Sequence, residues 1–258
     1  MPDFANLPRL ELERMAAAGR ANLDCLRSLA RAGGSIVGEA LDGAGDIHEW
    51  RHYPAVDVYD PATHAQFYYH AHPREARAVG EHGHFHTFLR PRGMPAGVRP
   101  LMLPELAIPD APAQPQTPVL PPVRQPNQGE DNDKLSHLMA ISMDSRGWPI
   151  RLFTTNRWVT GETWYSAEDV ERMLDRFAVN TTRPSEPLNR WITAMFALFR
   201  PQMRALLGAR DAAIMNWRRR HRGKIHVFED RRLEVTSASE IDVEDQVRRI
   251  EEALRRAA

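Results

Sequence analysis

The sequence predicts an α+β fold, with an antiparallel β-sheet that carries helices mainly on one face. Three observations predict it. Strand-like segments come in neighbouring pairs joined by turns, helical segments gather toward the two ends of the chain, and a proline-rich insertion separates two predicted β-hairpins. We see no repeat of fixed period, so residues 1–258 are interpreted as a single α+β domain.

The first segments predict two helices and an edge strand. Residues 7–32 place apolar side chains near the helical period and end at Gly33-Gly34, which indicates a long helix. Residues 35–45 predict a short second helix. Residues 49–59 look extended, and Pro54 restricts that strand to the edge of a sheet because proline cannot donate a hydrogen bond to a neighbour.

A histidine-rich hairpin follows. Residues 64–88 contain six of the eleven histidines of the chain. With the period of a β-strand, His70 and His72 share a face with Tyr68, and His84 shares one with His86. If the chain folds back between the two strands, their apolar faces must coincide, which fixes the register parity and brings His70 near His84.

Residues 91–133 form the predicted proline-rich insertion or linker. Residues 91–126 hold eleven of the twenty prolines, and the polar run NQGEDND follows. Such a composition predicts a stretch without regular structure of its own. A surface-wrapping excursion and a functional lid are the two roles that we weigh for it.

A second hairpin is predicted from residues 135–143 and 148–156 around the turn DSRG. Residues 158–164 fit a short third strand or a structured loop. Helices are then expected from Ser166, over 188–207 with a kink or a division at Pro201, and separately around 212–217. Two strand-like pieces, 225–228 and 233–235, precede a terminal helix capped by Asp242.

Bulk composition excludes several classes of protein. Lys plus Arg and Asp plus Glu balance at 34 each, so neither a nucleic-acid partner nor a membrane surface is predicted. The single cysteine, Cys25, excludes a disulfide scaffold and cysteine-rich zinc modules. Without a leader-like start or a long apolar run, we expect a cytoplasmic protein.

The sharpest chemical signal is the motif EHGHFH at residues 81–86. Two histidines spaced H-x-H on a strand project to the same side, and a third imidazole or a carboxylate from a neighbour would complete a metal site. The candidate ligands are His70, His72, His82, His84 and His86. Zinc or non-haem iron suits neutral imidazole. The alternative is that these rings bind no ion, and either decorate a partly exposed face or hydrogen-bond one another and the tyrosines.

Three further residues are candidate ligand-binding groups: Tyr68, His137 and Arg151. Tyrosine and histidine can donate hydrogen bonds or carry protons, and arginine can hold an anion. The basic run after Trp217 is more typical of a solvated helix end than of a phosphate site. The chain contains no G-x-S-x-G, G-x-G-x-x-G or P-loop motif, which excludes the commonest hydrolase and nucleotide-binding signatures.

Several blocks resemble a bacterial family known only as a domain of unknown function: YDPATHAQFYYHAHP, GEHGHFHTFLRP, LSHLMAISMDSRGWPIRLFTTNRWVTGETW and FEDRRLEVTS. The similarity extends from the first predicted helix to the last, with the proline-rich insertion as the variable part. The resemblance implies a single-domain bacterial cytosolic protein. It implies no activity, cofactor or catalytic residue.

Two functional hypotheses follow from the residues. The first is a metal-dependent or histidine-based enzyme that acts on a small molecule at the His70/His84 face. The second is a non-catalytic binding or oligomerisation module, in which that face meets a partner or a second copy of the chain.

Overall fold

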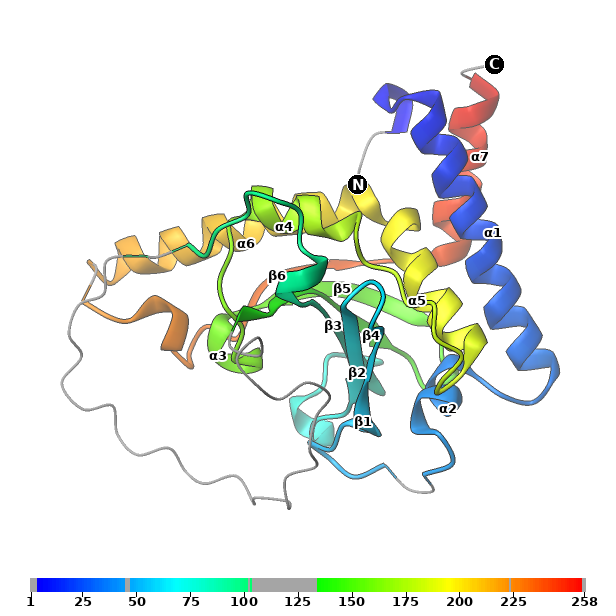
Figure 1. Cartoon of the computed structure of the whole chain (residues 1–258), viewed down its shortest axis with the longest axis horizontal. Helices are drawn as coiled ribbons and strands as arrows, with labels where there is room; N and C mark the ends of the chain where they lie inside the picture. Colours follow the sequence, from blue (N-terminus) through cyan, green and yellow to red (C-terminus); the bar gives the residue numbers. More distant parts are fainter. Residues whose placement is uncertain (1–3, 45–46, 102, 104–133, 223, 257–258) are drawn as a thin grey trace.

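The computed structural model describes residues 4–44, 47–101, 103, 134–222 and 224–256. Its centre is a six-stranded sheet in the order β1-β2-β3-β4-β5-β6, with each strand antiparallel to the next (Figure 1). The strands are β1 Tyr53–Tyr59, β2 Ala65–His70, β3 Gly83–Leu89, β4 Ser136–Met143, β5 Pro149–Thr155 and β6 Val235–Glu240. The predicted α+β fold class is confirmed.

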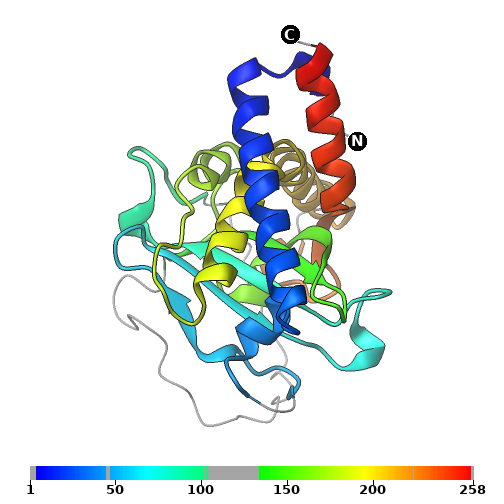
Figure 2. The ribbon, with the colours of Figure 1, turned by 90° about the vertical axis from the view of Figure 1, so that its right-hand side faces the viewer.

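The helices are α1 Arg9–Arg31, α2 Ile36–Leu41, α3 Arg157–Thr160, α4 Ala167–Leu174, α5 Glu186–Leu198, α6 Arg200–Arg220 and α7 Val243–Arg256. Helices α4, α5 and α6 lie along one side of the sheet (Figure 1). Helices α1 and α7, from opposite ends of the chain, run side by side (Figure 2). They approach closely at Gly19, where a Cβ atom would lie 2.5 Å from Val247 Cγ2.

The main core lies between the helices and one face of the sheet. Phe67, Tyr69 and Phe85 are fully buried on that face. The Phe85 ring lies 5.4 Å, centroid to centroid, from Trp191 of α5. Burial of this much aromatic and aliphatic surface is the main force that holds the helices on the sheet.

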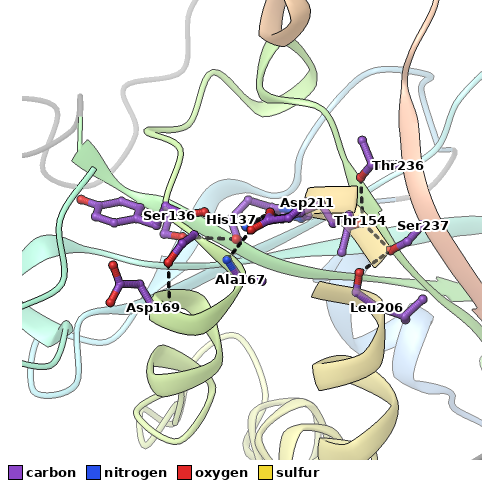
Figure 3. Close-up of polar contacts among 12 residues, drawn as sticks. Ser136, His137, Thr154, Ala167, Asp169, Leu206, Asp211, Thr236 and Ser237 are labelled. Carbon is purple, nitrogen blue, oxygen red and sulfur yellow. Dashed lines mark hydrogen bonds and ion pairs between the residues drawn. The ribbon is translucent and has the colours of Figure 1, made fainter. Parts of the chain in front are cut away.

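Polar contacts join β6 to α6, and α6 to the start of α4 (Figure 3). Ser237 of β6 donates from Oγ to the carbonyl oxygen of Leu206 in α6 at 2.9 Å, and its hydroxyl lies 2.6 Å from that of Thr154. The first amide of α4, at Ala167, donates to Asp211 at 2.6 Å. A carboxylate at a helix N-terminus satisfies a backbone donor that the helix itself leaves unpaired.

Most predicted elements are present. Both hairpins form, β1 with Pro54 lies at the edge of the sheet, and Ser166 caps α4 by accepting from the Asp169 amide. Asp242 likewise accepts from the Asp245 amide at the start of α7. The predicted division near Pro201 falls at Phe199, between α5 and α6, where proline is tolerated in the first turn of the second helix.

Three expectations were wrong in detail. Of the two alternatives for residues 158–164, the third strand does not form: α3, capped by the Asn156 side chain, ends at Gly161 in a left-handed conformation, and a loop follows through residue 164. A separate helix around 212–217 does not exist, because α6 runs unbroken through it. Of the two late strand-like pieces, 225–228 contains a 3-10 turn, and its apolar side chains pack with Trp164 and Ile214 instead of pairing with a strand.

The proline-rich prediction for 91–133 falls largely outside the described residues. Its first part contains a short 3-10 turn at Pro91–Gly93, and Pro100 forms a bridge with Tyr165. Within the described part of the chain, no helix has the length and hydropathy needed to cross a membrane.

Candidate metal centre

The histidine hairpin has the predicted register. In the β2–β3 pair, His70 lies opposite His84, and Tyr68 lies opposite His86. Every residue of both strands is buried, including those on the histidine face. The side chains of this face are therefore held in place by packing and hydrogen bonds within the chain.

Three imidazoles converge at the loop end of the hairpin. His70, His72 and His84 each offer a ring nitrogen, and these atoms all lie within 4.8 Å of one another. The Nε2 atoms of His70 and His84 are 2.7 Å apart, which is a hydrogen-bond distance. His72 lies just beyond β2 and is half-buried, with the Trp50 ring 4.4 Å away, centroid to centroid.

Glu81 orients the His84 ring. His84 Nδ1 lies 2.8 Å from Glu81 Oε1, and the Ser142 hydroxyl donates to Glu81 Oε2 at 2.6 Å. When Nδ1 carries the proton and donates to the carboxylate, Nε2 presents its lone pair to the other two histidines. This is the carboxylate–histidine arrangement that commonly supports metal-ligating histidines.

The electrostatics keep the carboxylate charged. Burial alone would raise the pKa of Glu81, but the hydrogen bonds from His84 and Ser142 and the nearby Arg151 bring that pKa below its ordinary value. Glu81 therefore remains an acceptor for His84 throughout the neutral range.

Two imidazoles of the trio, His70 and His72, are neutral at neutral pH. Burial, followed by the neighbouring histidines, lowers the pKa of His70 well below its ordinary value. Burial lowers the pKa of His72 to about 4, with His84 as the next cause. Since a metal ion binds the neutral ring, no proton has to be removed from these two histidines at neutral pH.

A second buried pair continues along the same face. His86 Nδ1 lies 3.0 Å from His137 Nε2, and both rings are almost completely buried. Burial lowers the pKa of His137 to about 3, with Arg210 as the next cause. Neither residue belongs to the converging trio, although His86 is 4.9 Å from His84 between ring centroids.

Glu162, a residue that no sequence motif indicates, lies next to this pair. Its Oε2 atom accepts the backbone N–H of His137 at 2.7 Å. Burial is the main cause that raises the pKa of Glu162 to about 8. Its position between two tryptophans in WVTGETW was a weak signal of burial, but only the fold places it beside His137.

The remaining candidates lie at different places. His82 precedes β3, so strand alternation does not govern its side chain, and its Nδ1 lies 2.7 Å from the hydroxyl of Tyr69 on the helix side. Tyr68 is on the histidine face, where the His52 ring stacks on it at 3.6 Å between centroids. Burial raises the pKa of Tyr68. Arg151 is on β5, opposite Ser142.

The trio is close to the geometry of a three-histidine metal site. Two nitrogens on a tetrahedral zinc ion lie about 3.3 Å apart, given zinc–nitrogen distances of about 2.0–2.1 Å. The His70–His84 nitrogen pair, at 2.7 Å, would have to separate by a few tenths of an ångström. Ring rotation supplies such a movement, so a metal ion would replace the hydrogen bond between the two rings.

Comparison with known proteins identifies a family but no activity. A family model described as "Domain of unknown function (DUF6969)" matches residues 16–241. No curated protein and no solved structure matches the chain.

Proposed function

The chain belongs to the DUF6969 family, whose description states no reaction, and from its histidine face we propose that it binds a transition-metal ion through His70, His72 and His84. The observation that carries the proposal is the convergence of three imidazole nitrogens, one of them oriented by the buried Glu81 carboxylate. Zinc and non-haem iron are the ions that neutral imidazole ligands suit.

We further propose that the metal is catalytic. Three protein ligands leave coordination positions for water or a substrate, whereas structural zinc sites are usually closed by a fourth protein ligand. A zinc ion at such a position activates water for hydrolysis, and an iron ion binds dioxygen or a chelating substrate. The reaction class is thus metal-assisted chemistry on a small molecule.

A binding module that holds the same ion without turnover is the second candidate. It uses the same ligands, so metal affinity does not separate the two. Turnover of a generic ester or phosphate monoester by the zinc-loaded chain, abolished by chelator and restored by zinc, would support the enzyme. A stoichiometric metal complex that turns over neither probe favours the binding module.

Metal affinity tests the site itself. The full chain is stripped with chelator, reloaded with Zn²⁺ or, anaerobically, with Fe²⁺, and analysed for metal content and for affinity by chelator competition. We expect one ion per chain, and a loss of affinity of about 100-fold or more in His84→Ala and in His70→Ala, because each removes one ligand.

His82→Ala is the matched control. It removes an imidazole of the same hairpin whose ring contacts Tyr69 instead of the trio, so its metal affinity should stay within about threefold of wild type. Circular dichroism is used to check that each variant is folded. Substoichiometric metal in the wild-type chain, or equal affinities in His84→Ala and His82→Ala, would overturn the proposal.

A further inference from the structure

A row of polar side chains crosses the histidine face at right angles to the strands. The register places His70 opposite His84, His84 opposite Ser142, and Ser142 opposite Arg151. Residues that are directly opposite on neighbouring strands point to the same face of a sheet. Arg151 is therefore on the face of the trio. Its Cα atom lies two strands from that of His84, about 10 Å along the row, since adjacent strands lie about 4.8 Å apart.

The Arg151 guanidinium lies over the ring of Phe153, close to the trio. Its Cζ atom lies 5.1 Å from the centroid of Phe153, whose ring in turn packs edge-on against His84 at 5.1 Å. Within the described part of the chain, Arg151 forms no ion pair or hydrogen bond through its side chain. Glu240 lies directly opposite Arg151 on β6 and is exposed, and the two side chains do not form a salt bridge.

Glu81 does not take up the hydrogen-bonding capacity of Arg151. One oxygen of Glu81 accepts from His84 and the other accepts from Ser142. Arg151 acts on Glu81 through its charge only. The five N–H donors of the guanidinium, in the fork geometry that matches carboxylates and phosphates, are left for another group.

The charge of the site favours an anion once a metal is bound. The divalent ion adds two positive charges and Arg151 adds one, whereas Glu81 and the exposed Glu240 opposite Arg151 supply one negative charge each. The imidazole ligands add none when they are neutral. An excess of about one positive charge in a partly buried site attracts an oxyanion and strengthens its hydrogen bonds to arginine.

We propose that Arg151 is the anion subsite of this metal centre, so that the ligand is a small molecule that carries a carboxylate or a phosphate group. The inference rests on the proposed metal site. It adds the chemical class of the ligand: one part reaches the metal at His70, His72 and His84, and the anionic group pairs with Arg151 in the same row.

The test uses the full chain loaded with Co²⁺, whose visible absorption reports changes at the metal. Acetate and methylphosphonate are titrated as the carboxylate and phosphate probes, with neutral acetamide for comparison. We expect saturable binding of at least one anion and none of acetamide. Arg151→Gln should weaken anion binding by about tenfold or more, as expected for loss of charge-assisted hydrogen bonds.

Controls separate a subsite from a general loss of charge. Arg146→Gln removes an exposed arginine of the same hairpin, paired with Asp144, and should leave anion affinity unchanged. Arg151→Lys keeps the charge without the fork and should be intermediate, which also guards against a Gln variant that fails to fold. Anion affinities equal to wild type in Arg151→Gln, with Co²⁺ affinity retained, would overturn the inference.

Failure of the metal site has a different signature. If the chain takes up no Co²⁺, the proposed function is wrong. Calorimetric titration of the two anions into the metal-free chain then tests whether Arg151 binds an anion. Binding that Arg151→Gln abolishes would support the subsite, and the absence of binding in wild type would refute it. The probe that binds more tightly identifies carboxylate or phosphate as the natural group.

Discussion

Phe67, Tyr69 and Phe85 on one face of the β2–β3 hairpin pack against helices, whereas Tyr68, His70 and His84 on the other face contact one another. The same two strands build both faces, and both are buried. On the helix face, contacts are nondirectional and scale with apolar area. On the histidine face, each buried polar atom needs a partner in the right direction, because an unpaired one costs free energy.

The two faces are expected to have different roles: the helix face stabilises the fold, and the histidine face carries the proposed chemistry. Substituting histidines by apolar residues of similar volume is the kind of change that often leaves stability unaffected or improved, since buried polar networks contribute little net free energy. On the proposal of a metal site, the network around Glu81 positions the ligands of the ion and contributes little to folding. Three predictions test this division between the faces.

Truncation of the helix face should reduce stability most. Phe85 is fully buried between Phe67, Tyr69 and Trp191, so Phe85→Ala should lower the free energy of unfolding by about 3–5 kcal/mol. Urea denaturation measures the loss. Under conditions where the variant remains folded, its metal affinity should stay near wild type. Equal losses of stability and of metal affinity in this variant would contradict the division between the faces.

Glu162 should make stability depend on pH. Its folded-state pKa of about 8 is raised above the ordinary 4.5, so the protonated carboxyl stabilises the fold fully below about pH 4.5. That contribution is lost as the pH rises toward 8. At about 1.4 kcal/mol per pH unit, Glu162→Gln, which stays neutral, should be a few kcal/mol more stable than wild type at pH 8.

The same variant should match wild type near pH 4.5. Comparison of the two proteins cancels the titration of the histidines, which they share. Urea denaturation at several pH values gives the difference directly. A difference that is constant from pH 5 to pH 8 would mean that Glu162 is ionised in the folded chain throughout this range.

Glu81 should increase the metal affinity of the site without binding the ion itself. Glu81→Gln removes the charge that supports His84, so metal affinity should fall by about 10- to 100-fold, with little change in stability. Chelator competition measures it. Glu75→Gln, in the same loop but exposed, is the control and should behave as wild type. If Glu81→Gln binds metal as tightly as wild type, the carboxylate has no supporting role.

Local sequence determined most of the elements and the composition of both faces. Period-2 alternation together with one buried apolar face left only one parity for the histidine hairpin, and His70 does lie opposite His84. Capping by Ser166 and Asp242 and the break before Pro201 are local effects, so they could be predicted from a few residues.

The contacts between polar groups from distant segments depend on the tertiary structure. His82 fits the alternation of β3, but it lies outside the strand and turns to Tyr69. Residues 225–228 resemble a strand, yet Val227 and Phe228 pack beside Trp164 and Ile214 instead of pairing with the sheet. Glu162 and Arg151 join the histidine face through α3–α4 and β5, and such contacts between distant segments have no local signature. Local alternation thus makes one face rich in imidazole, whereas the packing of distant segments places particular carboxylates and one arginine beside it.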